Sequence, residues 1–438
     1  MRNGRADAGR PGDDRLPAST AKTLRYDKVG TRLLLLIYGC LIAGRFTLDR
    51  LGPSWPAVDL RLAGLLMVAL LFLAWRLGAR KGLRRRVTTG PVLVLMLGWS
   101  GWMALSGFWS PPSARVTDGW LDLALLSVFV VLAAVVAGWL PREAMDSLWL
   151  WTVIAGLIYF VTAVAAGPGD QGRYAAPGGG PNVFVRVMVL GAIAALYLHL
   201  SGRSQWILAV IPVFAVGAVL SGSRGGLLSG ALVVLLGAVP VARRLGVRRM
   251  CGLLIAGAAT LWIAVLLTGS TVTDFIRARF IRQTLGERYT SGRDDITADA
   301  LDLFESRPWA GVGLDGYYGL RGIYSGSEYP HSLILATAAE GGVVGLLFLG
   351  VALLAVAVVL RKLRPLSLGA LFLFLAGTYV LVAQMFSGDY YDSRLMWLFF
   401  VLAAVEARRP VGKRSRTPAS PPAGVKYTPR DHKWGSSR

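Results

Sequence analysis

Long apolar runs, each bounded by charged residues, recur along most of this chain and constrain its fold more than any other feature. A bilayer core is crossed by roughly 20 apolar residues in a helix, and the runs have about that length. Of the 438 residues, 54% are hydrophobic and only 16% are charged, whereas a soluble domain carries about 25% charged residues. The sequence therefore predicts an all-α polytopic membrane protein.

The length of the runs predicts about twelve transmembrane helices. They are expected over Thr31–Leu48, Ala57–Leu77, Pro91–Phe108, Trp120–Leu140, Ser147–Ala166, Asn182–Leu200, Trp206–Leu220, Gly225–Val241, Cys251–Thr268, Gly341–Leu360, Leu366–Phe386 and Leu395–Ala407. Arginine and lysine gather after alternate runs, and the positive-inside rule places such loops in the cytoplasm. Both termini are then cytoplasmic.

The formal charge of +22 is explained by this topology and by two basic ends. On a soluble chain it would suggest nucleic acid, but here we expect no nucleic-acid partner. The predicted organisation is a basic cytoplasmic tail at 1–29, a transmembrane domain at 30–409 and a basic disordered cytoplasmic tail at 410–438. The two cysteines lie inside predicted spans and are interpreted as packing residues. No spacing typical of a metal site occurs, so neither a metal nor a cofactor is expected.

One large extracytoplasmic loop is predicted at 269–329. A loop of this length is often functional. Its segment Asp294–Glu305 has apolar residues at helical spacing. Several aromatic residues lie in the loop, among them Tyr317, and such rings could stack on sugars. A site on this face would meet no cytoplasmic ATP or sugar nucleotide.

Arg224 lies between two short apolar runs, in the sequence Ser-Arg-Gly-Gly. An arginine at this depth is costly unless it is paired or hydrated. One interpretation is an interfacial anchor that reaches lipid headgroups. The other is an anion site, because guanidinium makes forked contacts with phosphate. The residues alone leave both open.

Arg293 and His331 are two further candidates on the same predicted face. Arg293 precedes two aspartates, so it belongs either to an anion site or to a charged helix start. His331 follows Pro330, a residue that favours the first position of a helix. A helix N-terminus favours neutral imidazole, which is the form a general base needs. The alternative for His331 is a polar interfacial residue.

Other polar residues near the predicted outer surface complete the candidate set. Asn182 and Arg186 are four residues apart and share a helix face. Glu340 lies nine residues after His331, which places it on roughly the opposite helix face, so we expect it to orient backbone or a neighbouring helix instead. Asp389 and Arg394 belong to a last charged cluster, interpreted either as a salt-bridged turn or as part of a pocket rim.

The order of these motifs resembles the O-antigen ligase and polymerase family, the WaaL/Wzy-like membrane glycosyltransferases. The motifs run from Pro181-Asn182 through Ser223-Arg224-Gly225, Ser291-Gly292-Arg293, Arg307-Pro308-Trp309-x-Gly311-Val312-Gly313 and Pro330-His331-Ser332 to Glu340-Gly341-Gly342-x-x-Gly345. The similarity covers roughly residues 180–400. Many members have asparagine after the histidine, whereas this chain has Ser332.

The resemblance implies a GT-C-like helical enzyme in the bacterial inner membrane. Such enzymes take a glycan from undecaprenyl diphosphate at the outer face and pass it to an acceptor hydroxyl on a glycan or lipid, with inversion and without a metal. By this resemblance Arg224 and Arg293 hold the diphosphate, and His331 is the base. The remaining substrate-binding candidates are Asn182, Arg186, Tyr317, Asp389 and Arg394.

Two other functions fit a chain with many spans. A flippase that moves lipid-linked oligosaccharide often shows internal repeats with broken helices at the midplane. No repeat relates the two halves of this chain, and its charged motifs lie at one surface. A structural scaffold leaves the large loop and its arginines unexplained. Ligase and polymerase, in contrast, share the motifs and are not separated by them.

Overall fold

The computed structural model describes residues 18–51, 54–78, 90–169, 172–175, 178–203, 205–267, 293–363 and 366–409, with residues 274, 277, 278 and 282 besides. Within these ranges the regular structure is helical and contains no strand, only an isolated bridge between Thr47 and Asp59. The predicted all-α class is confirmed. The predicted tail at 410–438 and most of 269–292 lie outside the described residues.

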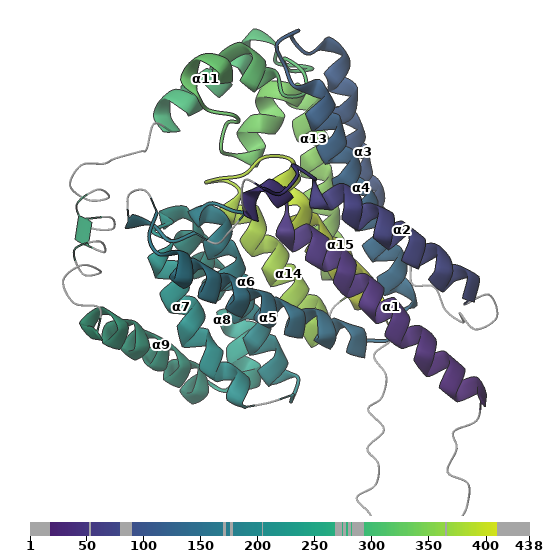
Figure 1. The fold of residues 1–438 in the computed structure, drawn as a ribbon, viewed down its shortest axis with the longest axis vertical. Coiled ribbons are helices and arrows are strands. Elements are labelled where there is room, and N and C mark those ends of the chain that lie inside the picture. The colour runs from purple at the N-terminus through teal and green to yellow at the C-terminus, as the bar shows by residue number, and fades with distance from the viewer. Residues whose placement is uncertain are drawn as a thin grey trace, which may run out of the picture. The chain divides into compact units, whose positions relative to one another are not determined.

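Every predicted span contains a helix (Figure 1). The helices are α1 (Ala18–Ala43), α2 (Leu60–Gly78), α3 (Pro91–Ser106), α4 (Val116–Trp139), α5 (Glu143–Ala166), α6 (Pro181–Leu200), α7 (Val210–Leu220), α8 (Arg224–Leu245), α9 (Val247–Leu267), α13 (Leu333–Lys362), α14 (Leu368–Ala383) and α15 (Arg394–Ala407). In the described ranges, seven helices are long and apolar enough to cross a membrane. The number of twelve spans therefore stays a prediction. Helix α1 begins inside the segment expected to be a tail.

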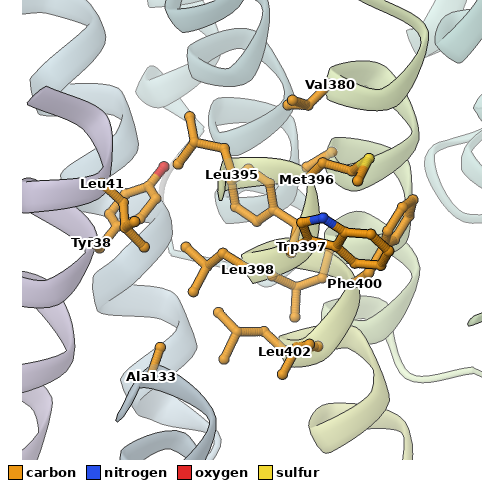
Figure 2. Close-up of a cluster of buried hydrophobic side chains, with 14 of the residues drawn as sticks. Tyr38, Leu41, Ala133, Val380, Leu395, Met396, Trp397, Leu398, Phe400 and Leu402 are labelled. Carbon is orange, nitrogen blue, oxygen red and sulfur yellow. The ribbon is translucent and has the colours of Figure 1, made fainter. Parts of the chain in front are cut away.

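Helix α15 is the centre of the hydrophobic core (Figure 2). It packs against α14, α4 and α13, and nearly all its residues are buried. Its aromatic side chains meet rings from other helices: Trp397 lies 5.6 Å from Trp99, and Phe399 stacks on Trp149 at 5.9 Å between ring centroids. Each large aromatic contact of this kind buries much apolar area. An element predicted only as a span is thus enclosed by protein.

Helix α11 (Arg293–Ser306) confirms the helix expected in the large loop, and it packs on α13. Helix α13 is broken at Gly342, where φ is +65°. The loop after α11 fills the break: the N–H of Val343 donates to the carbonyl of Pro308 at 2.7 Å, and the N–H of Val312 donates to the carbonyl of Ala339 at 2.8 Å. Backbone groups freed by the kink are therefore satisfied by the Arg-Pro-Trp motif.

Candidate active site

Arg224 is the first residue of α8. The preceding Ser223 caps the helix, because its hydroxyl accepts a hydrogen bond from the N–H of Gly226 at 3.3 Å. A side chain at Gly225 would collide with Phe386, and one at Gly226 would collide with Val185. The glycines that follow Arg224 are therefore explained by close packing of the helix start against neighbouring segments.

Arg293 is the first residue of α11 and is partly buried. Ala300 and Leu303, on the inner face of the same helix, pack in a small apolar cluster with Ala339 of α13, which fixes where the helix start lies. Burial lowers the pKa of Arg293, and the positive charge of Arg224 lowers it further. The two arginines are therefore close enough to repel one another, although they come from distant parts of the sequence.

His331 lies in the loop before α13, with a backbone φ of +54°. The prediction that Pro330 begins the helix is wrong: Ser332 is the N-cap, and its hydroxyl accepts from the N–H of Leu335 at 3.5 Å. A serine side chain can cap orphan N–H groups, which proline cannot do. His331 is thus held outside the helix, with its ring 4.4 Å from the ring of Tyr329.

The imidazole of His331 is disposed toward its neutral form. Burial lowers its pKa below the ordinary value of 6.5, Arg293 lowers it further, and Asp392 opposes the shift. The prediction of a neutral imidazole rested on a helix N-terminus. In the structure, the causes are burial and the nearby guanidinium of Arg293. The pKa of Arg293 is itself lowered by the charge of Arg224.

Asn182 and Arg186 share one face of α6, as predicted, and both contact Ser387. The amide of Asn182 donates to the Ser387 hydroxyl at 2.9 Å, and the guanidinium of Arg186 donates to the Ser387 carbonyl. Asn182 also accepts from the hydroxyl of Ser223 at 2.8 Å. This chain of contacts ties α6 and the segment after α14 to the residue beside Arg224.

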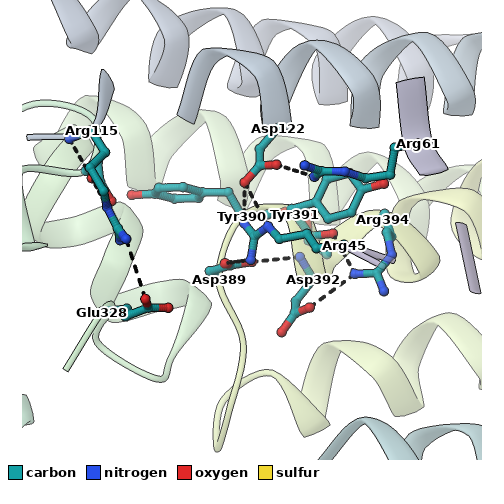
Figure 3. A network of polar contacts seen from close by, with 12 residues as sticks. Arg45, Arg61, Arg115, Asp122, Glu328, Asp389, Tyr390, Tyr391, Asp392 and Arg394 are labelled. Carbon is teal, nitrogen blue, oxygen red and sulfur yellow. Dashed lines mark hydrogen bonds and ion pairs between the residues drawn. The ribbon is translucent and has the colours of Figure 1, made fainter. Parts of the chain in front are cut away.

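Asp389 and Arg394 belong to an ion-pair network (Figure 3). Asp389 pairs with Arg45. Arg394 is buried and donates to the carbonyl of Leu41 at 2.6 Å and to Asp392 at 3.1 Å. The salt-bridged turn, one of the two predicted alternatives, describes Arg394 better than a pocket rim does, because its guanidinium is occupied within the protein.

Asp392 links this network to the candidate site. Its carboxylate lies 3.3 Å from Arg186 and 3.1 Å from Arg394. Burial opposes its ionisation, but these arginines and Arg45 outweigh burial and lower the pKa of Asp392 to about 2. The ionised carboxylate of Asp392 therefore raises the pKa of His331, whereas Arg293 lowers it.

Tyr317 does not lie where sugar stacking needs it. Its side chain is fully buried, in the apolar cluster that includes Leu303, Val312 and Ala339. An aromatic residue in a polar loop was expected to face the substrate, but in this place it forms the base on which α11 packs. The aromatic ring that contacts His331 is that of the half-buried Tyr329, which the predicted site did not include.

The sequence prediction also missed a cavity of about 260 Å³ near Tyr329. Its walls carry Arg45, Arg61 and Asp122, which form one ion-paired group in which Arg61 and Asp122 are buried (Figure 3). A signal was present in the sequence, because these three charges lie near the outer ends of three predicted spans. Ionisable residues inside predicted spans are candidates for function by default.

Known proteins resemble the part of the chain that holds these residues. The family model described as O-antigen ligase matches residues 207–350, a stretch that contains Arg224, Arg293 and His331. An O-antigen ligase of Pseudomonas aeruginosa (strain PAO1) is 29% identical over 276 residues, which are 60% of this chain. Both comparisons support the O-antigen ligase family. The resemblance seen in the motif order is thereby confirmed.

The match to the Pseudomonas O-antigen ligase covers 64% of the length of that relative, less than two thirds. Together with the apolar helices, the O-antigen ligase resemblance supports a multi-pass protein of the inner membrane with a role in glycan transfer. The relative's own activity is not carried over by this similarity. Donor, acceptor and stereochemistry have to be argued from the site.

Proposed function

We propose that this protein transfers or polymerises a glycan from undecaprenyl diphosphate onto an acceptor hydroxyl at the outer face of the inner membrane. The observation that carries the proposal is that Arg224 and Arg293 are near enough for the positive charge of Arg224 to lower the pKa of Arg293, and that Arg293 lowers the pKa of His331 in turn. Two like charges held together raise the free energy of the empty site. A diphosphate would relieve this repulsion and gain forked hydrogen bonds from both guanidinium groups.

The proposed step displaces the diphosphate from the sugar. A lone pair of the acceptor hydroxyl forms a bond to the anomeric carbon, and the bond from that carbon to the diphosphate oxygen breaks, with its electron pair leaving on the diphosphate. His331 accepts the hydroxyl proton. Attack from the face opposite to the leaving group inverts the anomeric carbon. Arg224 and Arg293 stabilise the charge that grows on the diphosphate, and such preorganised groups contribute most in the transition state.

The remaining site residues have positioning roles in this proposal. Asn182 joins Ser223 to Ser387, so it fixes the start of α8 relative to the segment after α14. Arg186 holds Asp392, whose charge balances Arg293 around His331. The same proposal includes a GT-C-like fold with about twelve spans and both termini in the cytoplasm, since that topology puts Arg224, Arg293 and His331 outside.

The test measures glycan transfer by purified protein from an undecaprenyl-diphosphate donor. Arg224→Ala and Arg293→Ala should each lower the rate by about 10² to 10³, the usual loss when one group that stabilises developing charge is removed. Arg321→Ala is the matched control, because Arg321 lies in the same loop but pairs with Asp299 and Asp302. Near-normal transfer by both Arg224→Ala and Arg293→Ala would sink the proposal.

A further inference from the structure

The cavity of about 260 Å³ has a charge pattern opposite to that of the Arg224 and Arg293 pair. It is formed by the ends of α1, α2 and α4, by the loop before α13 and by the segment before α15. Three arginines line it against six carboxylic acids: Arg45, Arg61 and Arg115 against Asp118, Asp122, Asp315, Glu328, Glu340 and Asp389. The acids outnumber the arginines two to one.

Each cavity arginine is already engaged by carboxylates. Arg45 pairs with Asp122 and Asp389, and Arg61 pairs with Asp122 and, at 2.6 Å, with Asp59. A guanidinium saturated by carboxylates has little left to offer a phosphate.

Arg115 lies at the mouth of the cavity. It is 3.3 Å from Asp315 and 3.5 Å from Glu328, and its guanidinium lies 3.6 Å from the ring centroid of Tyr318. Glu328 and Asp118 are exposed at the rim. An anion that approaches this mouth therefore meets acids before it meets any cation that is not neutralised.

The cavity opens beside the proposed base. Tyr329 and Pro330 line it, and the ring of Tyr329 is 4.4 Å from the ring of His331, the next residue but one. On the other wall, Asp389 accepts a hydrogen bond from the N–H of Asp392, which influences His331 electrostatically. A molecule in the cavity would thus lie beside Tyr329 and within reach of the residue next to it in space, His331.

Size and chemistry together define the ligand. The cavity is smaller than the roughly 300–1,000 Å³ typical of drug-sized ligands, so it suits one small polar unit. Carboxylates accept hydrogen bonds from hydroxyl groups, and the rings of Tyr329 and Tyr390 offer flat apolar surface. A sugar ring without negative charge satisfies all three conditions.

We propose that this cavity is the acceptor pocket, and that it selects a sugar ring bearing no phosphate or carboxylate. The inference rests on the proposed transfer function, because an acceptor pocket has meaning only beside a donor site. It separates the roles of the two regions: the arginine pair takes the anionic donor, and the carboxylate-rich cavity takes a neutral or cationic acceptor. The hydroxyl that reacts would approach His331 past Tyr329.

The test uses octyl glycosides of glucose, galactose and N-acetylglucosamine and the 6-phosphates of the same three compounds. Each is added to purified protein with the undecaprenyl-diphosphate donor. Both glycan transfer and donor hydrolysis are measured, since a bound compound that is not glycosylated still slows hydrolysis by water. Neutral glycosides should accept glycan or inhibit hydrolysis at concentrations at least about tenfold lower than their phosphates.

The variant Glu328→Lys reverses one rim charge and should lower this preference for neutral compounds by about tenfold, with each variant compared with its own rate of donor hydrolysis in the absence of glycoside. Asp118→Lys is a second variant with the same expectation. Glu305→Lys is the matched control, because Glu305 is exposed in the same loop but does not line the cavity. The side chains of Glu328 and Asp118 are both exposed, so their substitution should preserve folding.

Three results would overturn the acceptor pocket. The phosphates could act as well as the neutral glycosides, none of the six compounds could transfer or compete, or Glu328→Lys and Asp118→Lys could behave like Glu305→Lys. In each case donor turnover that still depends on Arg224 and Arg293 would leave the proposed function standing. Loss of that dependence would remove the proposed function instead.

Discussion

Two groups of arginines in this protein differ in what surrounds them. Arg45, Arg61 and Arg394 are bound to carboxylates or carbonyls in a network that joins the first, second, fourth and last described helices. At Arg293, in contrast, burial and the positive charge of Arg224 both lower the pKa of the guanidinium. Arginines of the first kind hold helices together, whereas a pair of the second kind stores unfavourable charge that a bound anion can release.

The largest effect is expected at Asp122, the carboxylate that pairs with both Arg45 and Arg61. Asp122→Ala should cost about 1–3 kcal/mol of stability, because the buried Arg61 and the exposed Arg45 lose the carboxylate they share but keep Asp59 and Asp389 respectively. Thermal unfolding in detergent measures this. Asp118→Ala, four residues earlier in the exposed first turn of the same helix, is the control and should change little. Equal unfolding temperatures for the two variants would show that the network is not structural.

Helix α13 links the candidate site to the cavity. His331 of the site precedes the helix, and Glu340 of the cavity lies just before its kink at Gly342. Gly342→Ala should destabilise by about 1–3 kcal/mol, because φ is +65° there and the new methyl would lie 2.6 Å from the amide nitrogen of Gly311. Gly350→Ala is the control in the same helix, with nothing within 4 Å of its added carbon. That change should be neutral or stabilising. Matching losses in thermal unfolding would contradict the role of the kink.

The variant Arg293→Lys tests whether recognition of the diphosphate needs the forked donors of arginine as well as its positive charge. The positive charge is kept, but the forked pair of donors is lost. The expected fall in kcat/KM for transfer is about tenfold, smaller than the fall for Arg293→Ala. The same exchange at Arg321 should leave kcat/KM unchanged, because Arg321 pairs with acids at the surface. If lysine serves at residue 293 as well as arginine, forked recognition of the diphosphate is wrong.

The smallest effect concerns pH. Burial and Arg293 both lower the pKa of His331, so its neutral form persists below pH 6.5 in the wild type. Removing the charge in Arg293→Gln raises that pKa, and the acidic limb of the pH profile of kcat/KM should move to higher pH. The shift is partial, because burial is the larger cause and remains. Arg321→Gln should not move the limb. An acidic limb unaffected by Arg293→Gln would exclude His331 as the titrating group.

The sequence predicted the helical elements better than their surroundings. Run length and a proline located α6, and periodicity located α11, because both signals are local. The expected role of Glu340 is confirmed as well: its carboxylate accepts from the N–H groups of Asp315 and Tyr317 at 3.1 and 3.2 Å. The nine-residue separation on a helix was enough to exclude a pairing of Glu340 with His331, and backbone was then the expected partner of Glu340.

What the sequence could not show are contacts between distant segments. The partners of Arg45 are 77 and 344 residues away, and no spacing rule reaches that far. The burial of Tyr317 was missed for the same reason, since its cover comes from α11 and α13. The start of α13 was misplaced by two competing local signals, proline and serine, and the serine hydroxyl prevailed through a real hydrogen bond.

The enclosure of α15 has a consequence for how the protein is made. Ribosomes deliver helices in order, and the inner faces of α4, α13 and α14 stay uncovered until Trp397 and its neighbours arrive. Helices inserted early must therefore wait in the lipid as a loose assembly, held by other pairings such as α5 with α6. Synthesis that stalls before residue 394 would leave a chain that is inserted but unassembled, the kind of product that membrane proteases remove.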